Sequence, residues 1–422
     1  MLIGRLLTRS GDQAWDFAVP LVLLQIFPGE LRIAALYYLL VRIAMVLFLP
    51  RFSRVIDQID RLKAAKLGVS LQLVGVTFGF VSVLVLSKII SHSFQSIEFV
   101  SIFSVLVFSG TLSQLGSTFM DISIANDLVP SSFKGDELAR FNSRLRQVDL
   151  FTEVASPIVA GSLLLFTSTH WPLLGFSLIA LWNVVSFFPE YGLLKSIFNE
   201  RPDLKDKPLK IEDTKKQSIL SQIRSGWSSF FREPVAMVVL AYALLWLSVL
   251  SPHGVLLTAF LKDGWKLPEL TIGVFRGAGA LFGLLATILF PLALKKMSVE
   301  KASFLFLAFQ ALMLGIGYIL FLRADNFGQI GFLVLILFSR VGLYGFSLGE
   351  MQIRQIGIAP QVRGEVNGFA NALTALATIG LFGAAVALPS TEDFKYLVLS
   401  SIGFVVLALI IYGSWYRSRS RL

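Results

Sequence analysis

The chain has 422 residues, of which 55% are hydrophobic and only 15% are charged, whereas soluble domains are about one quarter charged. Its mean hydropathy of +0.73 excludes a molecule whose whole surface faces water, and the absence of cysteine excludes disulfides and thiolate metal sites. The formal net charge of +10 would suit nucleic acid only if the basic residues gathered on one surface.

Apolar runs recur along the chain at about 20 residues each, the length that a transmembrane helix needs. They predict twelve such helices, at roughly 8–27, 31–50, 64–87, 98–121, 145–167, 170–195, 233–261, 269–294, 301–322, 328–350, 364–388 and 394–416. The first run contains charged residues, so it is not a simple apolar signal peptide. The predicted fold class is an all-α polytopic membrane protein.

The basic residues are concentrated in alternate loops of this twelve-helix topology. With both termini placed in the cytosol, 28 of the 37 Lys and Arg residues fall on the inside, six on the outside and three within helices. This asymmetry follows the positive-inside rule, so the basic excess reflects membrane topology and no nucleic-acid partner is expected. The predicted location is the lipid bilayer of the plasma membrane, or cell inner membrane, as a multi-pass protein with both termini cytosolic.

The first predicted helix carries Thr8, Asp12 and Asp16, which a spacing of four places on one face. A charged side chain at mid-bilayer costs roughly 2.5–3.5 kcal/mol on insertion scales. Such groups persist where they face a cavity or a partner, which makes Asp12 a candidate ligand and Thr8 and Asp16 secondary ones. The alternative is that Asp12 lies near the cytosolic end, where water or an arginine neutralises it.

Charged residues also gather in the loops after the second helix and before the fifth. We expect them to form gating ion pairs that hold one conformation and separate as the two halves of the molecule rock. Single exposed ion pairs are weak, so only a cluster would set the equilibrium. The predicted gating residues are Asp57, Arg61, Arg144, Asp149 and Arg363.

Polar residues reappear in the third and sixth predicted helices. Gln72 stands in an apolar stretch, where a glutamine is more often an interhelical hydrogen-bonding residue than a ligand. Asn183, Ser186 and Glu190 follow one another at i, i+3 and i+7 and form one stripe. Together with Asp12 they offer carboxylate, amide and hydroxyl oxygens, the hard ligands that suit a hydrated divalent cation rather than a sugar or an apolar drug.

The longest polar stretch, 196–232, divides the chain near its middle. Its charges and irregular backbone could not be satisfied in lipid, so we expect a cytosolic linker there. The linker separates an N-terminal six-helix bundle, 1–195, from a C-terminal one, 233–422. Two such halves are the plan of the major facilitator superfamily, although this architecture alone names no substrate.

The seventh predicted helix is interrupted by Pro252, His253 and Gly254. Proline removes a helical hydrogen bond and glycine tolerates the resulting turn. Two interpretations stay open for His253, one of three histidines in the chain. It binds a transition metal or relays a proton, or it is a hydrogen-bonded residue at a structural kink.

Four segments together resemble the ferroportin family of ferrous-iron exporters, in order and over most of the chain. They are GDQAWDFAVPLVLL, DRLKAAKLGVSLQ, WNVVSFFPEY and RGEVNGFANAL. They are similar to that family's Gly-Asp-x-x-Trp-x-Phe-Ala-Val, Arg-Leu-Lys, Trp-Asn-x-Val-Ser…Glu-Tyr and Arg-Gly-x-x-Asn-Gly segments, so the chain looks like a prokaryotic homologue. The resemblance implies a first-half cation site on Asp12, Gln72, Asn183 and Glu190, with Ser186 beside it.

The second half departs from the family's pattern. Vertebrate members carry an Asp-Cys pair in the seventh helix, where this chain has His253 and Gly254, and their eleventh-helix histidine falls at Leu381. The vertebrate second metal site is therefore in doubt here, and binding of the peptide hormone hepcidin is not expected. We predict that His253 substitutes as a ligand from one position earlier.

These observations predict export of a divalent transition metal by alternating access, Fe²⁺ first and also Co²⁺, Ni²⁺ or Zn²⁺, by a monomer. Proton exchange is expected because Asp12, Glu190 and His253 can each trade a proton for a metal. No cofactor is expected, although the oxygen-rich first-half site should also accept Ca²⁺.

Two other functions stay open: a facilitator-type exporter of organic cations or drugs, and a non-transporting membrane receptor or scaffold. An enzyme is not expected, because the sequence has no nucleophile–base constellation and no phosphate loop.

Overall fold

The computed structural model describes the chain over residues 1–88, 96–121, 124, 128–133, 135–167, 173–204, 235–251, 253–323, 325–357, 363–388 and 390–419. Within these ranges the chain is helical and has no β-strand, which confirms the predicted all-α fold class. Ten of the described helices are long and apolar enough to cross a membrane.

The chain divides into two compact units, Met1–Glu212 with Thr258–Gly277, and Asp213–Leu257 with Ala278–Leu422. The first unit contains the helices α1 (Leu2–Ile26), α2 (Leu31–Gln58), α3 (Arg61–Leu86), α4 (Ile97–Asp121), α5 (Val129–Ser132), α6 (Gly135–Thr167), α7 (Leu174–Glu200) and η2 (Pro202–Leu204). The second contains α9 (Ala236–Leu245), α12 (Val299–Phe321), α13 (Asn326–Gly357), α14 (Arg363–Ala387), η3 (Thr391–Asp393) and α15 (Phe394–Arg419). Two helices, α10 (Val255–Asp263) and α11 (Glu269–Leu294), contribute residues to both units. The predicted boundaries 1–195, 196–232 and 233–422 stay a prediction, and most of the linker lies outside the described residues.

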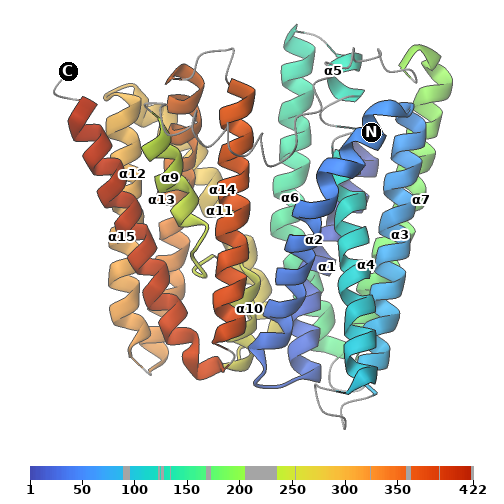
Figure 1. The fold of residues 1–422 in the computed structure, drawn as a ribbon, viewed down its shortest axis with the longest axis horizontal. Helices are drawn as coiled ribbons and strands as arrows, with labels where there is room; N and C mark the ends of the chain where they lie inside the picture. The colour runs from blue at the N-terminus through green and yellow to red at the C-terminus, as the bar shows by residue number, and fades with distance from the viewer. Residues whose placement is uncertain are drawn as a thin grey trace. The chain divides into compact units, whose positions relative to one another are not determined.

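In the first unit, α1 lies against α6 and α7, while α3 packs along α4 and α7 (Figure 1). Glycines let α3 and α4 approach closely. A Cβ on Gly75 would lie 2.5 Å from the backbone nitrogen of Ser113, and one on Gly116 would lie 2.5 Å from the carbonyl oxygen of Gly68. Any larger residue at either glycine would therefore push α3 and α4 apart.

In the second unit, α12 packs along α13 and α15, and α9 contacts α13, α14 and α15. Tyr412 of α15 is fully buried, and its hydroxyl donates to the carbonyl oxygen of Glu300 at 3.0 Å. The third helix of each predicted half begins in the same way. Asp60 accepts a hydrogen bond from the backbone N–H of Lys63, and Ser298 accepts one from that of Lys301. These N-caps satisfy donors that a helix start leaves free.

The first and seventh predicted spans differ most from ordinary membrane helices. Helix α1 begins at Leu2, six residues before its apolar run, and Arg5, the one charged residue of that added segment, is buried within the protein. The run 233–261 is predicted as one span interrupted at Pro252, His253 and Gly254. Instead α9 ends at Leu245 and α10 begins at Val255, so the interruption is longer and starts well before the proline, which itself is not described.

Side chains of neighbouring helices satisfy two backbone groups of the unwound segment. The guanidinium of Arg340 on α13 donates to the carbonyl oxygen of Leu250 at 2.7 Å. The backbone N–H of Val249 donates to the hydroxyl of Ser401 on α15 at 2.9 Å. Irregular backbone is stable at membrane depth only when such partners replace the helical hydrogen bonds.

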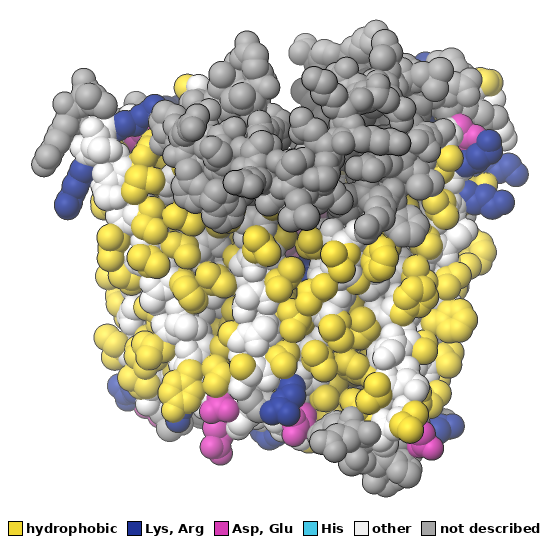
Figure 2. Space-filling model, viewed as in Figure 1, with side chains coloured by type: hydrophobic (Ala, Val, Ile, Leu, Met, Phe, Trp, Pro, Cys, Tyr) yellow, Lys and Arg dark blue, Asp and Glu magenta, His cyan; other side chains and the backbone are white. Residues whose placement is uncertain are grey.

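The exposed surface of the helices is apolar along their middle. Figure 2 shows hydrophobic side chains over the central part of the helices, with charged side chains mainly toward the helix ends. Large exposed residues include Phe78, Phe108 and Phe188 in the first unit and Ile319 and Ile410 in the second. Apolar surface on this scale is stable against lipid rather than water.

Candidate functional site

The polar stripe of α7 lies against α1 because glycines on α1 make room for it. A Cβ on Gly11 would lie 3.0 Å from the Cα of Asn183, and a Cβ on Gly4 would lie 3.2 Å from the Cα of Glu190. The two glycines are seven residues apart on α1, and Asn183 and Glu190 are seven residues apart on α7, so two turns of each helix meet in register. The packing therefore brings Asn183 beside the segment that carries Asp12.

Asp12 accepts hydrogen bonds from two further helices. Gln72 Nε2 on α3 donates to its carboxylate at 3.2 and 3.4 Å, and Ser117 Oγ on α4 donates to Oδ2 at 3.0 Å. Gln72 is only 1% exposed, and its Oε1 has no donor among the described residues. Gln72 thus makes the interhelical hydrogen bond that glutamine favours and keeps an oxygen free beside Asp12.

The three predicted residues of α7 are almost fully buried: Asn183 is 1% exposed, and Ser186 and Glu190 are 2% exposed. Ser186 Oγ donates to the carbonyl oxygen of Asn183 at 2.7 Å. Within the described part of the chain, neither Oδ1 nor Nδ2 of Asn183 has a hydrogen-bond partner. A buried amide without partners costs about 1–3 kcal/mol, so it points to a bound species that supplies the missing contact.

The secondary candidates Thr8 and Asp16 occupy different surroundings. Thr8 is buried and donates to the carbonyl oxygen of Gly4 at 3.1 Å, within hydrogen-bonding reach of the Glu190 carboxylate. Asp16 instead lines a cavity together with Asp12. The structure therefore turns Thr8 toward α7 and Asp16 toward that cavity.

The cavity has a volume of about 260 Å³ and lies within the first unit. Its charged lining residues are Arg9, Asp12, Asp16 and Asp121, and its uncharged polar ones are Gln13, Tyr37, Tyr38, Ser113, Gln114, Ser117 and Thr118. Three carboxylates against one guanidinium make the lining net negative. The cavity is wide enough for a cation that keeps part of its water shell.

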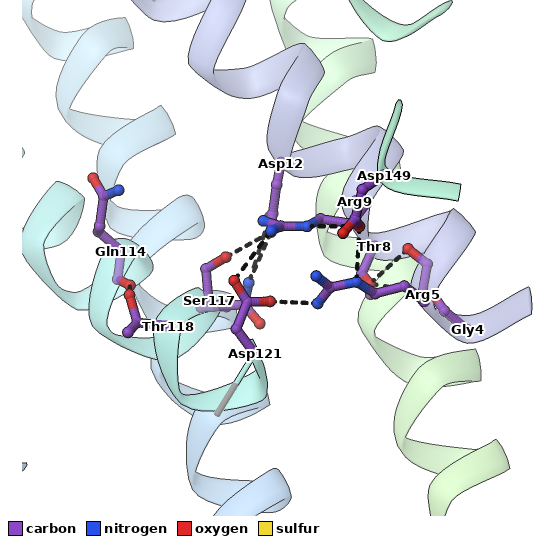
Figure 3. Close-up of polar contacts among 11 residues, drawn as sticks. Gly4, Arg5, Thr8, Arg9, Asp12, Gln114, Ser117, Thr118, Asp121 and Asp149 are labelled. Carbon is purple, nitrogen blue, oxygen red and sulfur yellow. Dashed lines mark hydrogen bonds and ion pairs between the residues drawn. The ribbon is translucent and has the colours of Figure 1, made fainter. Parts of the chain in front are cut away.

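Next to Asp12, an ionic network joins α1 to α4 and α6 (Figure 3). Arg5 pairs with Asp121, and its Nε lies 3.1 Å from Asp149. Arg9 lies 3.1 Å from Asp121 and 3.5 Å from Asp149. The two arginines and two aspartates compensate one another in charge.

This network includes one of the predicted gating residues. Asp149 pairs within the first unit with Arg5 and Arg9 of α1, whereas the side chain of Arg363 is not described, so the predicted gating role stays a prediction. Arg61 is buried and donates to the carbonyl oxygen of Leu204 at 2.8 Å, which fastens α3 to η2. Arg144 is exposed, and the side chain of Asp57 lies outside the described residues.

His253 belongs to the second unit, in the turn between α9 and α10. Its ring is half-buried, and the next residue, Gly254, donates its N–H to the carbonyl oxygen of Ser251 at 2.8 Å. The residue therefore lies in an interrupted membrane helix, as its flanking residues predict. Whether it binds metal stays a prediction.

Among the described residues, no three acidic or histidine side chains come together in a way that could hold a metal ion. A metal at Asp12 would therefore depend on neutral oxygens, those of Gln72, Asn183 and Ser117, in addition to the carboxylate. Such a donor set has hard oxygens and low charge, which suits weak, reversible binding of a divalent cation.

Ser117, Asp121 and Arg9 belong to this site, although none was predicted from the sequence. A signal was present on the fourth helix, where Gln114, Ser117 and Asp121 follow one another at i, i+3 and i+7. This is the same spacing that identified the stripe of α7. Polar stripes at equal spacing on two helices that pack in one unit should be read together.

The chain has close relatives among known proteins. The family model described as Ferroportin1 (FPN1) matches residues 1–405. Ferreportin of Bdellovibrio bacteriovorus is 46% identical over 416 residues, covering 98% of this chain and 93% of that protein. Among solved structures, a bacterial homologue of the iron transporter ferroportin in an inward-facing state has a TM-score of 0.89 at 45% identity, covering 98% of this chain and 97% of that one. A bacterial metal transporter has a TM-score of 0.82 at 42% identity, with coverage of 98% and 97%.

Proposed function

This chain belongs to the ferroportin family, and on that premise we propose that it exports a divalent transition metal from the cytosol by alternating access. Fe²⁺ is the first candidate, followed by Co²⁺, Ni²⁺ and Zn²⁺. Two bacterial proteins of similar sequence are described as a homologue of an iron transporter and as a metal transporter, which supports this substrate class. The same family membership argues for a transporter rather than an enzyme.

The observation that carries the proposal is the group of unpaired oxygens around Asp12. Gln72 Oε1 and Asn183 Oδ1 are buried without a donor among the described residues, and each belongs to a helix that touches α1 at Gly11 or Asp12. A cation between them would supply the missing partner and offset the carboxylate charge. Because most of these ligands are neutral, binding stays weak enough for release on the far side.

Protons and calcium enter the proposal through the same ligands. Asp12 and Glu190 bind metal only when deprotonated, so metal entry releases protons and an opposing pH gradient drives export. The oxygen-rich site of the first unit also accepts Ca²⁺, which favours oxygen ligands. The protein acts as a monomer in the plasma membrane, or cell inner membrane, with both termini in the cytosol, and it does not bind hepcidin.

Flux through purified protein in liposomes tests this function. We expect Fe²⁺ and Co²⁺ to be transported, and a pH gradient to change the rate. Asp12→Ala and Asn183→Ala should each weaken metal affinity by about tenfold or more, which corresponds to about 1.4 kcal/mol.

Gln310→Ala is a matched control, because Gln310 of α12 is also a buried amide whose Oε1 lacks a described donor, but it belongs to the second unit. Its metal affinity should stay close to that of the parent. Parent-like affinity in both site variants would rule out the Asp12 site. Transport of organic cations without any metal transport would favour the facilitator-type drug exporter instead.

A further inference from the structure

Arg9 lies where a cation would be expected. It stands three residues before Asp12 on α1, a spacing at which two side chains of a helix meet. Its guanidinium lines the same cavity as Asp12. No other Lys or Arg lines this cavity within the described residues.

Two aspartates from other helices hold Arg9 beside Asp12. Arg9 Nη2 lies 3.1 Å from Asp121 Oδ2 on α4, and its Nε lies 3.5 Å from Asp149 Oδ1 on α6. The Arg9 side chain is 23% exposed, compared with 34% for Asp121 and 24% for Asp149. The group is therefore wet enough for the guanidinium to exchange partners, whereas the neighbouring Arg5, at 7% exposed, is fixed.

Without a bound cation, the Asp12 carboxylate needs another positive charge, and Arg9 can supply it. A carboxylate without a counter-ion is costly at membrane depth, and the cavity holds the carboxylates of Asp12, Asp16 and Asp121. When a divalent cation is bound, Asp12 is neutralised and Arg9 rests on Asp121 and Asp149. When the cation leaves, the nearest positive charge on the same helix is Arg9.

We propose that Arg9 is a tethered counter-ion that competes with the transported metal for Asp12, and that Asp121 and Asp149 hold it aside while metal binds. The proposal rests on the metal site at Asp12 proposed above. It makes Arg9 and Asp121 positioning residues that set metal affinity without touching the metal. It also gives Asp12 a counter-ion in the metal-free transporter.

A double-mutant cycle measured by Co²⁺ calorimetry on the purified full chain tests this at about pH 8, where carboxylates are deprotonated. Arg9→Gln removes the competitor and should tighten Co²⁺ binding about tenfold. Asp121→Asn releases Arg9 toward Asp12 and should weaken binding by a similar factor. The double variant should bind as Arg9→Gln does, because Asp121 acts only through Arg9. Arg9→Lys keeps the charge and should bind like the parent.

Arg5→Gln is the matched control, since it removes an equal charge from the same network but not from the cavity lining. Its affinity should stay within about twofold of the parent. A second readout is transport, in which Arg9→Gln should keep metal–metal exchange but slow net efflux, because only net efflux requires the empty site.

The outcomes separate the competing accounts. Weakening by Asp121→Asn that persists in the Arg9→Gln background would make Asp121 a direct ligand and overturn the proposal. Equal affinity in the parent and Arg9→Gln would overturn it as well and leave the network a purely structural clamp. Failure of the parent to bind Co²⁺ would contradict the proposed function and this proposal with it.

Discussion

At the residue scale, the most informative side chains are those that fail to find partners. Asn183 is buried on α7 with both polar atoms unpaired among the described residues, although it packs directly against Gly11 of α1. Leaving an amide in this state destabilises the fold by about 1–3 kcal/mol, and a leucine of similar size would avoid that cost. The proposed metal site therefore explains this residue better than stability does.

A variant of His253 distinguishes its two possible roles, a metal ligand and a residue of a structural kink. Imidazole favours Fe, Co, Ni and Zn over Ca²⁺, whereas the site at Asp12 offers mainly oxygen. His253→Ala should therefore reduce the Co²⁺ stoichiometry and leave Ca²⁺ binding unchanged. It should also remove the part of Co²⁺ binding that is lost on acidification as the imidazole protonates. Calorimetry with both metals at two pH values measures this.

The control for that experiment is a variant that alters the backbone interruption and keeps the histidine. Gly254→Ala alters the turn next to His253 but keeps the imidazole, and a Cβ there would lie 2.9 Å from the carbonyl oxygen of Ser251. Unchanged Co²⁺ stoichiometry and pH dependence in His253→Ala would show that the histidine only completes a kink.

Sequence spacing could single out Asp12, Asn183 and Glu190 as candidates, because a charged or amide side chain stands out in an apolar helix. It could not identify partners. The structure pairs Asp149 with Arg5 and Arg9, which stand more than a hundred residues away in the chain. Such pairings depend on which helices pack together, and residue spacing along the chain does not reveal that.

At the element scale, the interrupted seventh helix was foreseen from Pro252 and Gly254 but its extent was not. The unwound segment extends from the end of α9 at Leu245 to the start of α10 at Val255. Proline and glycine explain the end of this segment only. Its earlier part is held by two residues of other helices. Arg340 donates to the carbonyl oxygen of Leu250, and Ser401 accepts a hydrogen bond from the N–H of Val249.

These two contacts predict how the segment responds to mutation. Ser401→Ala leaves the backbone N–H of Val249 without its acceptor, and should destabilise the protein by about 1–3 kcal/mol. Arg340→Met removes the donor to Leu250 and should destabilise it similarly, since methionine fills much of the volume but donates nothing. Thermal unfolding of the purified protein in detergent measures both.

Ser400→Ala is the matched control on the same helix. Among the described residues, the hydroxyl of Ser400 bonds only the carbonyl oxygen of Leu397 within α15, at 3.0 Å, so its loss should change the unfolding temperature little. If Ser401→Ala and Ser400→Ala behave alike, the contact to Val249 does not stabilise the interrupted helix.

At the scale of the whole molecule, apolar run length was a good guide to the spans and a poor one to their ends. Ten of the described helices satisfy length and composition, and the two predicted spans that do not are the first and the seventh. Helix α1 is too charged, because it carries Arg5, Arg9, Asp12 and Asp16, and the seventh span is interrupted. Several charges or an interrupted backbone hide a span from a search for apolar runs, whereas α3, α4 and α7 carry Gln72, Ser117 and Asn183 and still qualify.

The charge asymmetry of the loops predicts the orientation of the whole molecule. With 28 of 37 basic residues on one side, the positive-inside rule places both termini and 196–232 in the cytosol.

Because the chain has no cysteine, a single introduced cysteine reports one position. In intact cells, a membrane-impermeant maleimide should fail to label Lys207→Cys until the membrane is opened. Arg323→Cys should be labelled at once, because Arg323 follows α12 in a predicted outer loop and its side chain is 55% exposed. Labelling in the opposite order would invert the topology, and the direction of export proposed for the site at Asp12 would invert with it.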